Sequence, residues 1–348
     1  MATSRVTTLR GVTDERDGHG GHDGTARARS AALRDDLVDR SPQDAVATVV
    51  AGGPAYVAAL LGRDWMTVVD HVRRGESVAA GVAWRAAYAL QHLGHSGDAA
   101  AVLREADLAG ASEADRSRLA GVDASIRWTH GDEAGCRART EEALGRAKVA
   151  ADESAEGAAW VVQALLAAST GDRDANLRCY QRGLLLAERA GDLLTVERIR
   201  NNLGARELEE GRYAEALDEL HRGLEVNERT GHLSGLAVLR HNVAEALFGL
   251  GRLDEALIEC DAARDLWTAI EAPSAGVSWH LRGQIQTARG NSAQAAMSYR
   301  HSAALAAAEG DVQTQAMALV GHAAACAGSD IAEAIALAER ALALPTPV

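Results

Sequence analysis

The stretch "RIRNNLGARELEEGRYAEALDELHRGLEV", residues 198–226, decides the fold of this chain. Two runs of helical length meet at Gly211, and each run carries one small residue in its middle, Gly204 and Gly223. A glycine between two leucine- and alanine-rich runs is typical of a turn between helices. The stretch therefore predicts two antiparallel helices, with the pair Asn201-Asn202 on the first of them.

Glycines between two runs of helical length recur along the chain with a period of about forty residues. Turn glycines occur at Gly94, Gly131, Gly171, Gly211, Gly251, Gly290 and Gly328. Seven residues before each stands a small residue: Ala87, Ala124, Ala164, Gly204, Ala244, Gly283 and Gly321. Twelve residues after the first six comes another: Ala106, Ala143, Gly183, Gly223, Ala263 and Ser302. A fixed period with small residues on both helices predicts stacked helix pairs that share one core.

The period divides the chain into a tail and an array. Helix pairs are expected at 80–112, 114–153, 154–192, 193–232, 233–272, 273–311 and 312–345, and the best-formed repeats at 193–311. A divergent first pair is expected at 43–78, with Trp65 covering the open end. Residues 1–40 are rich in glycine and charge and are expected to be a flexible tail, which leaves 41–348 as one helical repeat domain.

Composition narrows the classes of function. Aromatic residues make up only 3% of the chain, which favours helices over strands. The formal net charge of −13 argues against direct binding of nucleic acid. No run of about 18 apolar residues is present, so we expect a cytoplasmic protein that does not bind membranes.

Neither a metal site nor a cofactor site is expected. The four cysteines, Cys136, Cys179, Cys260 and Cys326, lie far apart without a CxxC pair, and each is expected to be a buried thiol in a helix. His19 and His22 could bind a metal, but in a flexible acidic tract we expect them to have no specific role.

With the spacing known, "NNLGARELEEGRYAEALDELHRGLEV" (201–226) and "HNVAEALFGLGRLDEALIECDAARDL" (241–266) resemble tetratricopeptide repeats. The resemblance implies an all-α, right-handed α-solenoid of about seven to eight antiparallel helix pairs. The unit has about forty residues where the common motif has 34, which is similar to the repeat region of large bacterial transcriptional regulators of the LuxR and SARP types. The ATPase and DNA-binding domains of such regulators are not found in the sequence, so the resemblance implies a stand-alone, split or incomplete relative that senses a partner or ligand.

No catalytic residues are predicted. The sequence contains no GxSxG, HExxH or GxxxxGK[ST] motif, and paired carboxylates such as Glu209-Glu210 lie among arginines, as on a solvated surface. We therefore expect a non-catalytic, regulatory module that binds a protein or peptide. A self-associating scaffold and a small-molecule sensor are the alternatives, and the oligomeric state is left open.

The first helix of each pair lines the concave face in proteins that this chain resembles. At the corresponding positions of the fourth to sixth pairs lie eight polar residues, which we call the candidate groove residues: Arg198, Asn201, Asn202, His241, Asn242, Glu245, His280 and Gln284. Amides pair with both groups of a peptide backbone and arginine pairs with carboxylates, so this cluster, beside an apolar stretch at 158–165, suits an extended peptide or a helix. The competing interpretation is an ordinary surface, in which the asparagines bond only to their own turn and the neighbouring helix, and the histidines pack between helices.

Overall fold

The computed structural model describes residues 69, 72–92, 95–269 and 275–345. The predicted tail at 1–40 lies outside these residues, as does nearly all of the predicted pair at 43–78. The described chain divides into two compact units. The first unit contains the described residues up to Ile199 together with 225–232, and the second contains 200–224 and the described residues from Leu233 on. The prediction of one repeat domain over 41–348 stays a prediction.

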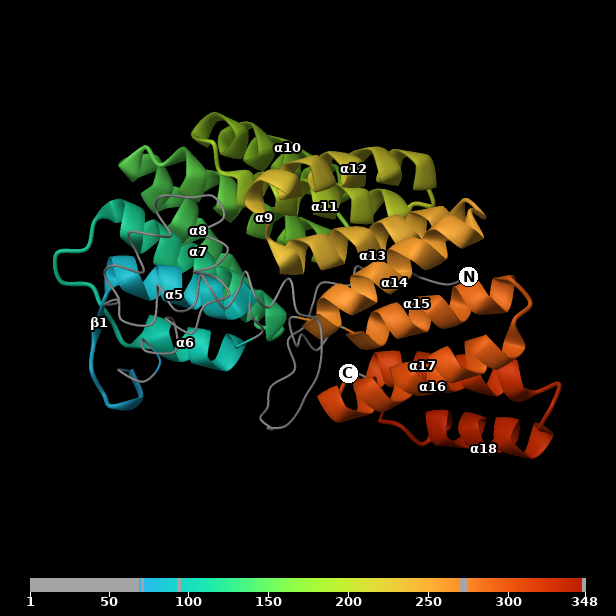
Figure 1. Cartoon of the computed structure of the whole chain (residues 1–348). Coiled ribbons are helices and arrows are strands. Elements are labelled where there is room, and N and C mark those ends of the chain that lie inside the picture. Colours follow the sequence, from blue (N-terminus) through green and yellow to red (C-terminus); the bar gives the residue numbers. More distant parts are fainter. Residues whose placement is uncertain (1–68, 70–71, 93–94, 270–274, 346–348) are drawn as a thin grey trace. The chain divides into compact units, whose positions relative to one another are not determined.

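Antiparallel helix pairs make up almost all of the described chain (Figure 1). The helices, in order, are α5 (Ala80–His92), α6 (Ser96–Arg104), α7 (Glu113–Thr129), α8 (Glu133–Ala150), α9 (Glu153–Ser169), α10 (Arg173–Ala190), α11 (Leu193–Glu209), α12 (Tyr213–Thr230), α13 (Leu233–Gly249), α14 (Leu253–Ala269), α15 (Ala275–Ala288), α16 (Ser292–Glu309), α17 (Val312–Cys326) and α18 (Ile331–Leu342). They form the seven pairs that the forty-residue period predicts, and the all-α solenoid is confirmed.

The turns between the two helices of a pair depend on glycine. Gly211 and Gly251 have φ angles of 70° and 73°, a region that residues with a Cβ rarely occupy. The described joints at Gly191, Gly231 and Gly310 use the same geometry, and at the joint after α8 Ala151 takes a φ of 51° in place of glycine. At these positions the glycine period marks where the backbone turns left-handed, whereas Gly328 has no positive φ.

Small residues let neighbouring helices approach closely, within a pair at Gly204 and between successive pairs at Gly223. A Cβ added to Gly204 would lie 2.6 Å from Cγ of Leu220, and one added to Gly223 would lie 2.7 Å from Cδ2 of Leu239. Leu220 and Leu239 are fully buried. The leucines thus occupy the space that the missing side chains leave, and the predicted close approach is confirmed at both glycines.

In the first unit, each pair stacks on the next. Helix α5 packs on α7, α7 packs on α9, and α8 packs on α9, so first helices form one layer and second helices the other. Asn176 of α10 stands where other repeats have alanine, and its buried Nδ2 donates to the carbonyl of Ala164 on α9 at 2.8 Å. Stacking in this unit therefore tolerates a polar residue where the neighbouring helix offers an acceptor.

One part of the predicted layout is wrong. The second helix of the pair at 80–112 ends at Arg104, and strand β2 (Ala106–Asp107) follows it. Strand β2 pairs in parallel with β1 (Val78–Ala79), and the N–H of Val78 donates to the carbonyl of Glu105. This pairing joins residues 28 apart, which a local helical pattern does not reveal.

In the second unit the stacking pattern continues. Helix α13 packs on α14 and α15, and α15 packs on α16 and α17. One buried cluster joins α11 to α15 through leucine and alanine side chains, including Leu208, Leu220, Leu239, Leu247 and Leu281. The first helices α11, α13 and α15 of this unit are consequently neighbours, and they carry most of the candidate groove residues.

Candidate functional site

The candidate groove residues do not all belong to the same unit. Seven of them lie in the second unit, on α11, α13 and α15, whereas Arg198 is in the first unit. All eight are partly buried, neither fully enclosed nor fully exposed. The candidate site of the second unit therefore consists of seven residues, and Arg198 belongs to the first unit.

The asparagines of neighbouring first helices bond to each other. The Nδ2 group of Asn242 on α13 donates to Oδ1 of Asn201 on α11 at 2.8 Å. The side chain of Asn202 makes no hydrogen bond within the described residues. Asn201 therefore links two first helices, whereas the side chain of Asn202 has no hydrogen-bond partner among the described residues.

The two histidines are held in the neutral form. The pKa of His241 and that of His280 are each lowered to about 4, mainly by burial, and the nearby His280 contributes to the shift of His241. Nδ1 of His241 lies 3.2 Å from Oγ of Ser278 on α15, which ties α13 to α15. Neutral rings offer hydrogen bonds rather than charge to a ligand at pH 7.

His280 leaves one polar atom without a partner. Its ring lies at a tilt against the ring of Tyr299, with 5.5 Å between centroids. Its Nδ1 atom is buried and makes no hydrogen bond in the described part of the chain. A buried, unpaired nitrogen costs about 1–3 kcal/mol, so an incoming hydrogen-bonding group would find a favourable position here.

Glu245 and Gln284 complete the set on α13 and α15. Both side chains are partly buried, and Glu245 interacts with other residues of the chain. The amide of Gln284 makes no hydrogen bond among the described residues. Among the candidate groove residues of the second unit, the amides of Asn202 and Gln284 and Nδ1 of His280 therefore have unused hydrogen-bonding capacity.

Arg198 is engaged inside the first unit. Its Nη2 lies 3.4 Å from Oγ of Ser125 on α7, and the same hydroxyl accepts from Nε2 of Gln91 on α5 at 2.9 Å. Val161 and Leu165 of the predicted apolar stretch are 0% and 5% exposed. The sequence predicts this apolar stretch beside the polar cluster of the groove, and these two of its residues belong to the core of the unit.

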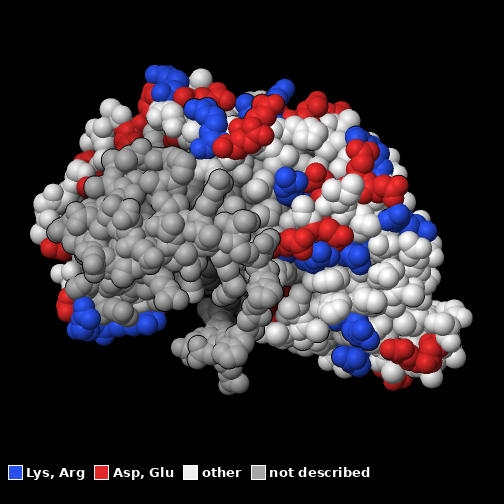
Figure 2. Space-filling view, viewed as in Figure 1, with Lys and Arg blue, Asp and Glu red and all other residues white. Residues whose placement is uncertain are grey.

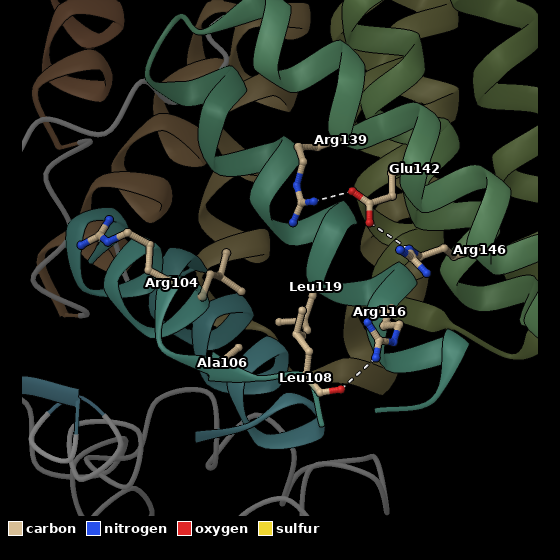
Figure 3. Close-up of a pocket in the computed structure, with 9 residues that line it drawn as sticks. Arg104, Ala106, Leu108, Arg116, Leu119, Arg139, Glu142 and Arg146 are labelled. Carbon is tan, nitrogen blue, oxygen red and sulfur yellow. Dashed lines mark hydrogen bonds and ion pairs between the residues drawn. The ribbon is translucent and has the colours of Figure 1, made fainter. Parts of the chain in front are cut away.

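The first unit also contains an arginine-rich pocket that the sequence argument missed (Figure 3). Its volume is about 150 Å³ and it lies among α6, β2, α7 and α8. Its lining residues are Leu103, Arg104, Ala106, Leu108, Arg116, Leu119, Arg139, Glu142 and Arg146. No spacing pattern in the sequence predicts this pocket, because its arginines come from three helices.

Most of the positive charge in this pocket is paired internally. Glu142 accepts from both Arg139 and Arg146, and Arg146 also donates to Glu113 at 2.8 Å. Arg116 donates to the carbonyl of Leu108 at 2.8 Å. The lining residues therefore offer charged and polar contacts to a ligand.

No family model and no curated protein matches the sequence. Solved structures do match the fold. A Rap protein complexed with Competence and Sporulation Factor has a TM-score of 0.60 and 12% identity, with 81% of this chain and 85% of that chain covered. The Cut9–Hcn1 hetero-tetramer of the APC/C has a TM-score of 0.54 and 13% identity, with 91% and 60% covered.

A third similar structure names the repeat itself. It is a signal transduction ATPase with numerous domains and a tetratricopeptide repeat sensor, from Pyrococcus horikoshii, with a TM-score of 0.57 and 14% identity, covering 90% of this chain and 47% of that one. The architecture is thus that of a tetratricopeptide-type repeat protein, as the forty-residue pattern predicted. In the described part of the chain, no helix is long and apolar enough to span a membrane.

Proposed function

We propose that this chain is a non-catalytic, regulatory module that binds a protein segment or peptide along α11, α13 and α15. The fold supports this proposal, because similar folds occur in a Rap protein complexed with a factor and in a hetero-tetrameric assembly. The forty-residue unit further suggests a stand-alone or split relative of the sensor region of a bacterial transcriptional regulator.

The unused hydrogen-bonding groups of the second unit carry the proposal. Asn202 and Gln284 have amides without a partner among the described residues, and Nδ1 of His280 is buried and unpaired. An extended segment presents N–H and C=O groups in alternation, and amide side chains pair with both. A bound backbone would satisfy groups that the described chain leaves unsatisfied.

The double variant Asn202→Ala/Gln284→Ala tests the site. Partners would be captured from an extract of the source cells on the immobilised chain, purified, and titrated against each variant. We expect the double variant to bind at least about tenfold more weakly, which corresponds to about 1.4 kcal/mol. Asp218→Ala, on the exposed face of α12, is the matched control and should bind as the wild type does. Equal affinity of the double variant would refute the site, and the lack of any specific partner would refute the function.

Self-association is a second candidate, which an exposed apolar face favours. Ile331, Ile335 and Leu342 of α18 are 66%, 54% and 85% exposed, and their spacing places them on one side of the helix. If this face joins two copies, the mass measured by light scattering should rise with concentration and fall for Ile335→Lys. A constant monomer mass would exclude the scaffold.

A further inference from the structure

Three side chains of different metal-binding types meet near the end of the described chain. His322 and Cys326 lie one turn apart on α17, and Glu333 lies in the first turn of α18. One ligand atom from each residue lies within 4.8 Å of the others. The imidazole and the thiol are buried, each residue being 7% exposed, while Glu333 is exposed and borders the solvent.

The backbone holds these residues in place without a metal. Residues four apart on a helix share a face, which brings His322 and Cys326 together. The N–H groups of Ser329 and Asp330 both donate to the carbonyl of Cys326, at 2.9 and 2.8 Å, so the turn after α17 is tight. The side chain of Asp330 then caps α18 by accepting from the N–H of Glu333 at 3.0 Å. The turn therefore fixes the backbone positions of the three residues, while the exposed side chain of Glu333 can adjust.

Burial and neighbouring charges shift the pKa of both buried side chains of the cluster. Burial lowers the pKa of His322, Glu333 raises it, and Arg300 and Arg340 lower it. Burial raises the pKa of the Cys326 thiol, and Glu333 and Asp330 raise it further. A metal ion that binds Cys326 through sulfur displaces the thiol proton.

We propose that His322, Cys326 and Glu333 bind one Zn²⁺ ion, with water as the fourth ligand. Nitrogen, thiolate and carboxylate are all zinc ligands, and the thiolate disfavours Mg²⁺ and Ca²⁺. Tetrahedral zinc with bonds of about 2.0–2.3 Å needs its ligand atoms about 3.3–3.8 Å apart. A contraction of about 1 Å is required, and the exposed side chain of Glu333 can supply it. The ion would join α17 to α18.

Cobalt titration of the full chain, purified without a histidine tag and kept reduced, tests the proposal. Co²⁺ replaces zinc in such sites and gives a near-ultraviolet band when a thiolate binds it. We expect one equivalent of Co²⁺ to produce this band and Zn²⁺ to remove it. Cys326→Ser should abolish the band, and Glu333→Gln should weaken Co²⁺ binding about tenfold or more.

Two control variants separate this cluster from other ligands of the chain. Cys179→Ser changes a buried cysteine of α10 and should leave the band unchanged. The double variant His19→Ala/His22→Ala should also retain it. A wild-type chain without the band, or a band that survives in Cys326→Ser, would overturn the proposal. If Cys326→Ser does not fold, Glu333→Gln decides, since its side chain is exposed and an unchanged affinity for Co²⁺ would contradict the site.

Discussion

Gly204 shows how one missing side chain supports a helix pair. Alanine at this position would place its Cβ 2.6 Å from Cγ of the fully buried Leu220, so one of the two must move. We expect Gly204→Ala to lower the free energy of unfolding by about 1–3 kcal/mol, as overpacking does. Urea denaturation followed by circular dichroism measures the change.

Gly145 provides the matched control for this prediction. It lies within α8, and a Cβ added there would meet nothing within 4 Å. Gly145→Ala should therefore stabilise the chain by about 0.5–1 kcal/mol through helix propensity. If both substitutions shift stability in the same direction, the contact with Leu220 is not the cause.

The two buried histidines predict a loss of stability in acid. Their pKa is about 4 in the folded chain and about 6.5 in an unfolded one. Between these values the unfolded chain binds more protons, so the stabilisation is complete above about pH 6.5 and is lost as the pH falls through 4. At pH 5 the loss should be on the order of 1–2 kcal/mol per histidine.

Melting curves at pH 7.5 and pH 5.0 measure this effect. The wild type should melt at a lower temperature at pH 5.0, and His241→Asn should show a smaller difference between the two pH values. His221→Gln changes an exposed histidine of α12 and should keep the wild-type difference. An equal pH dependence in all three chains would contradict the role of burial.

At the scale of single residues, the sequence predicted the positions of the turn glycines better than it predicted contacts between side chains. The period located Gly211 and Gly251 because a left-handed turn requires glycine, which is a local constraint. It could not show that Asn242 bonds to Asn201, since that bond depends on how two helices stack. The cluster of Cys326 was missed for a similar reason: its third ligand comes from the next helix, and only the four-residue spacing to His322 was visible.

Among the elements, the end of α12 depends on one buried carboxylate. Glu197 of α11 is 3% exposed and accepts from Nδ2 of Asn227 at 3.0 Å and from Oγ1 of Thr230 at 2.8 Å. Nδ1 of His232 lies 3.0 Å from its other oxygen. All four residues belong to the first unit. This network anchors the last turn of α12 and the joint that follows.

Removal of this carboxylate should loosen that turn. Glu197→Ala removes an acceptor that Asn227 and Thr230 share, while Nδ2 of Asn227 keeps the carbonyl of His232 and Oγ1 of Thr230 keeps the carbonyl of Asn227. Each lost hydrogen bond to a buried charged group costs about 1.5–3 kcal/mol. We expect faster amide hydrogen exchange at 225–232, measured by mass spectrometry. Glu228→Ala, on the exposed face of α12, is the control. Unchanged exchange in Glu197→Ala would refute the anchoring role.

Element boundaries were predictable where local chemistry sets them. The helix start at Glu153 follows Asp152, whose side chain caps the helix by accepting from the N–H of Ala155. The end of α6 at Arg104 was not predictable, because β2 forms only when β1 is beside it. Ala151 also departs from the glycine pattern, since the surrounding helices impose its positive φ.

For the whole molecule, the excess of acidic side chains predicts that the chain does not bind nucleic acid. It carries 49 acidic and 36 basic side chains. On the face shown in Figure 2, acidic and basic side chains of the described residues are intermingled rather than gathered by sign. We expect no shift of double-stranded DNA in a gel assay at 50 mM salt, where phosphate contacts are strong. A shift that disappears at higher salt would reveal a basic surface and contradict this expectation.

The link between Arg198 and Ser125 has a mechanical consequence for the first unit. It joins residues 73 apart in sequence, from α11 to α7, and passes over the intervening α9. A stack of helix pairs can bend, and a bond between two pairs that are not adjacent limits how far the stack can open. Optical-trap stretching of the chain should therefore show a softer response at low force in Arg198→Ala than in the wild type.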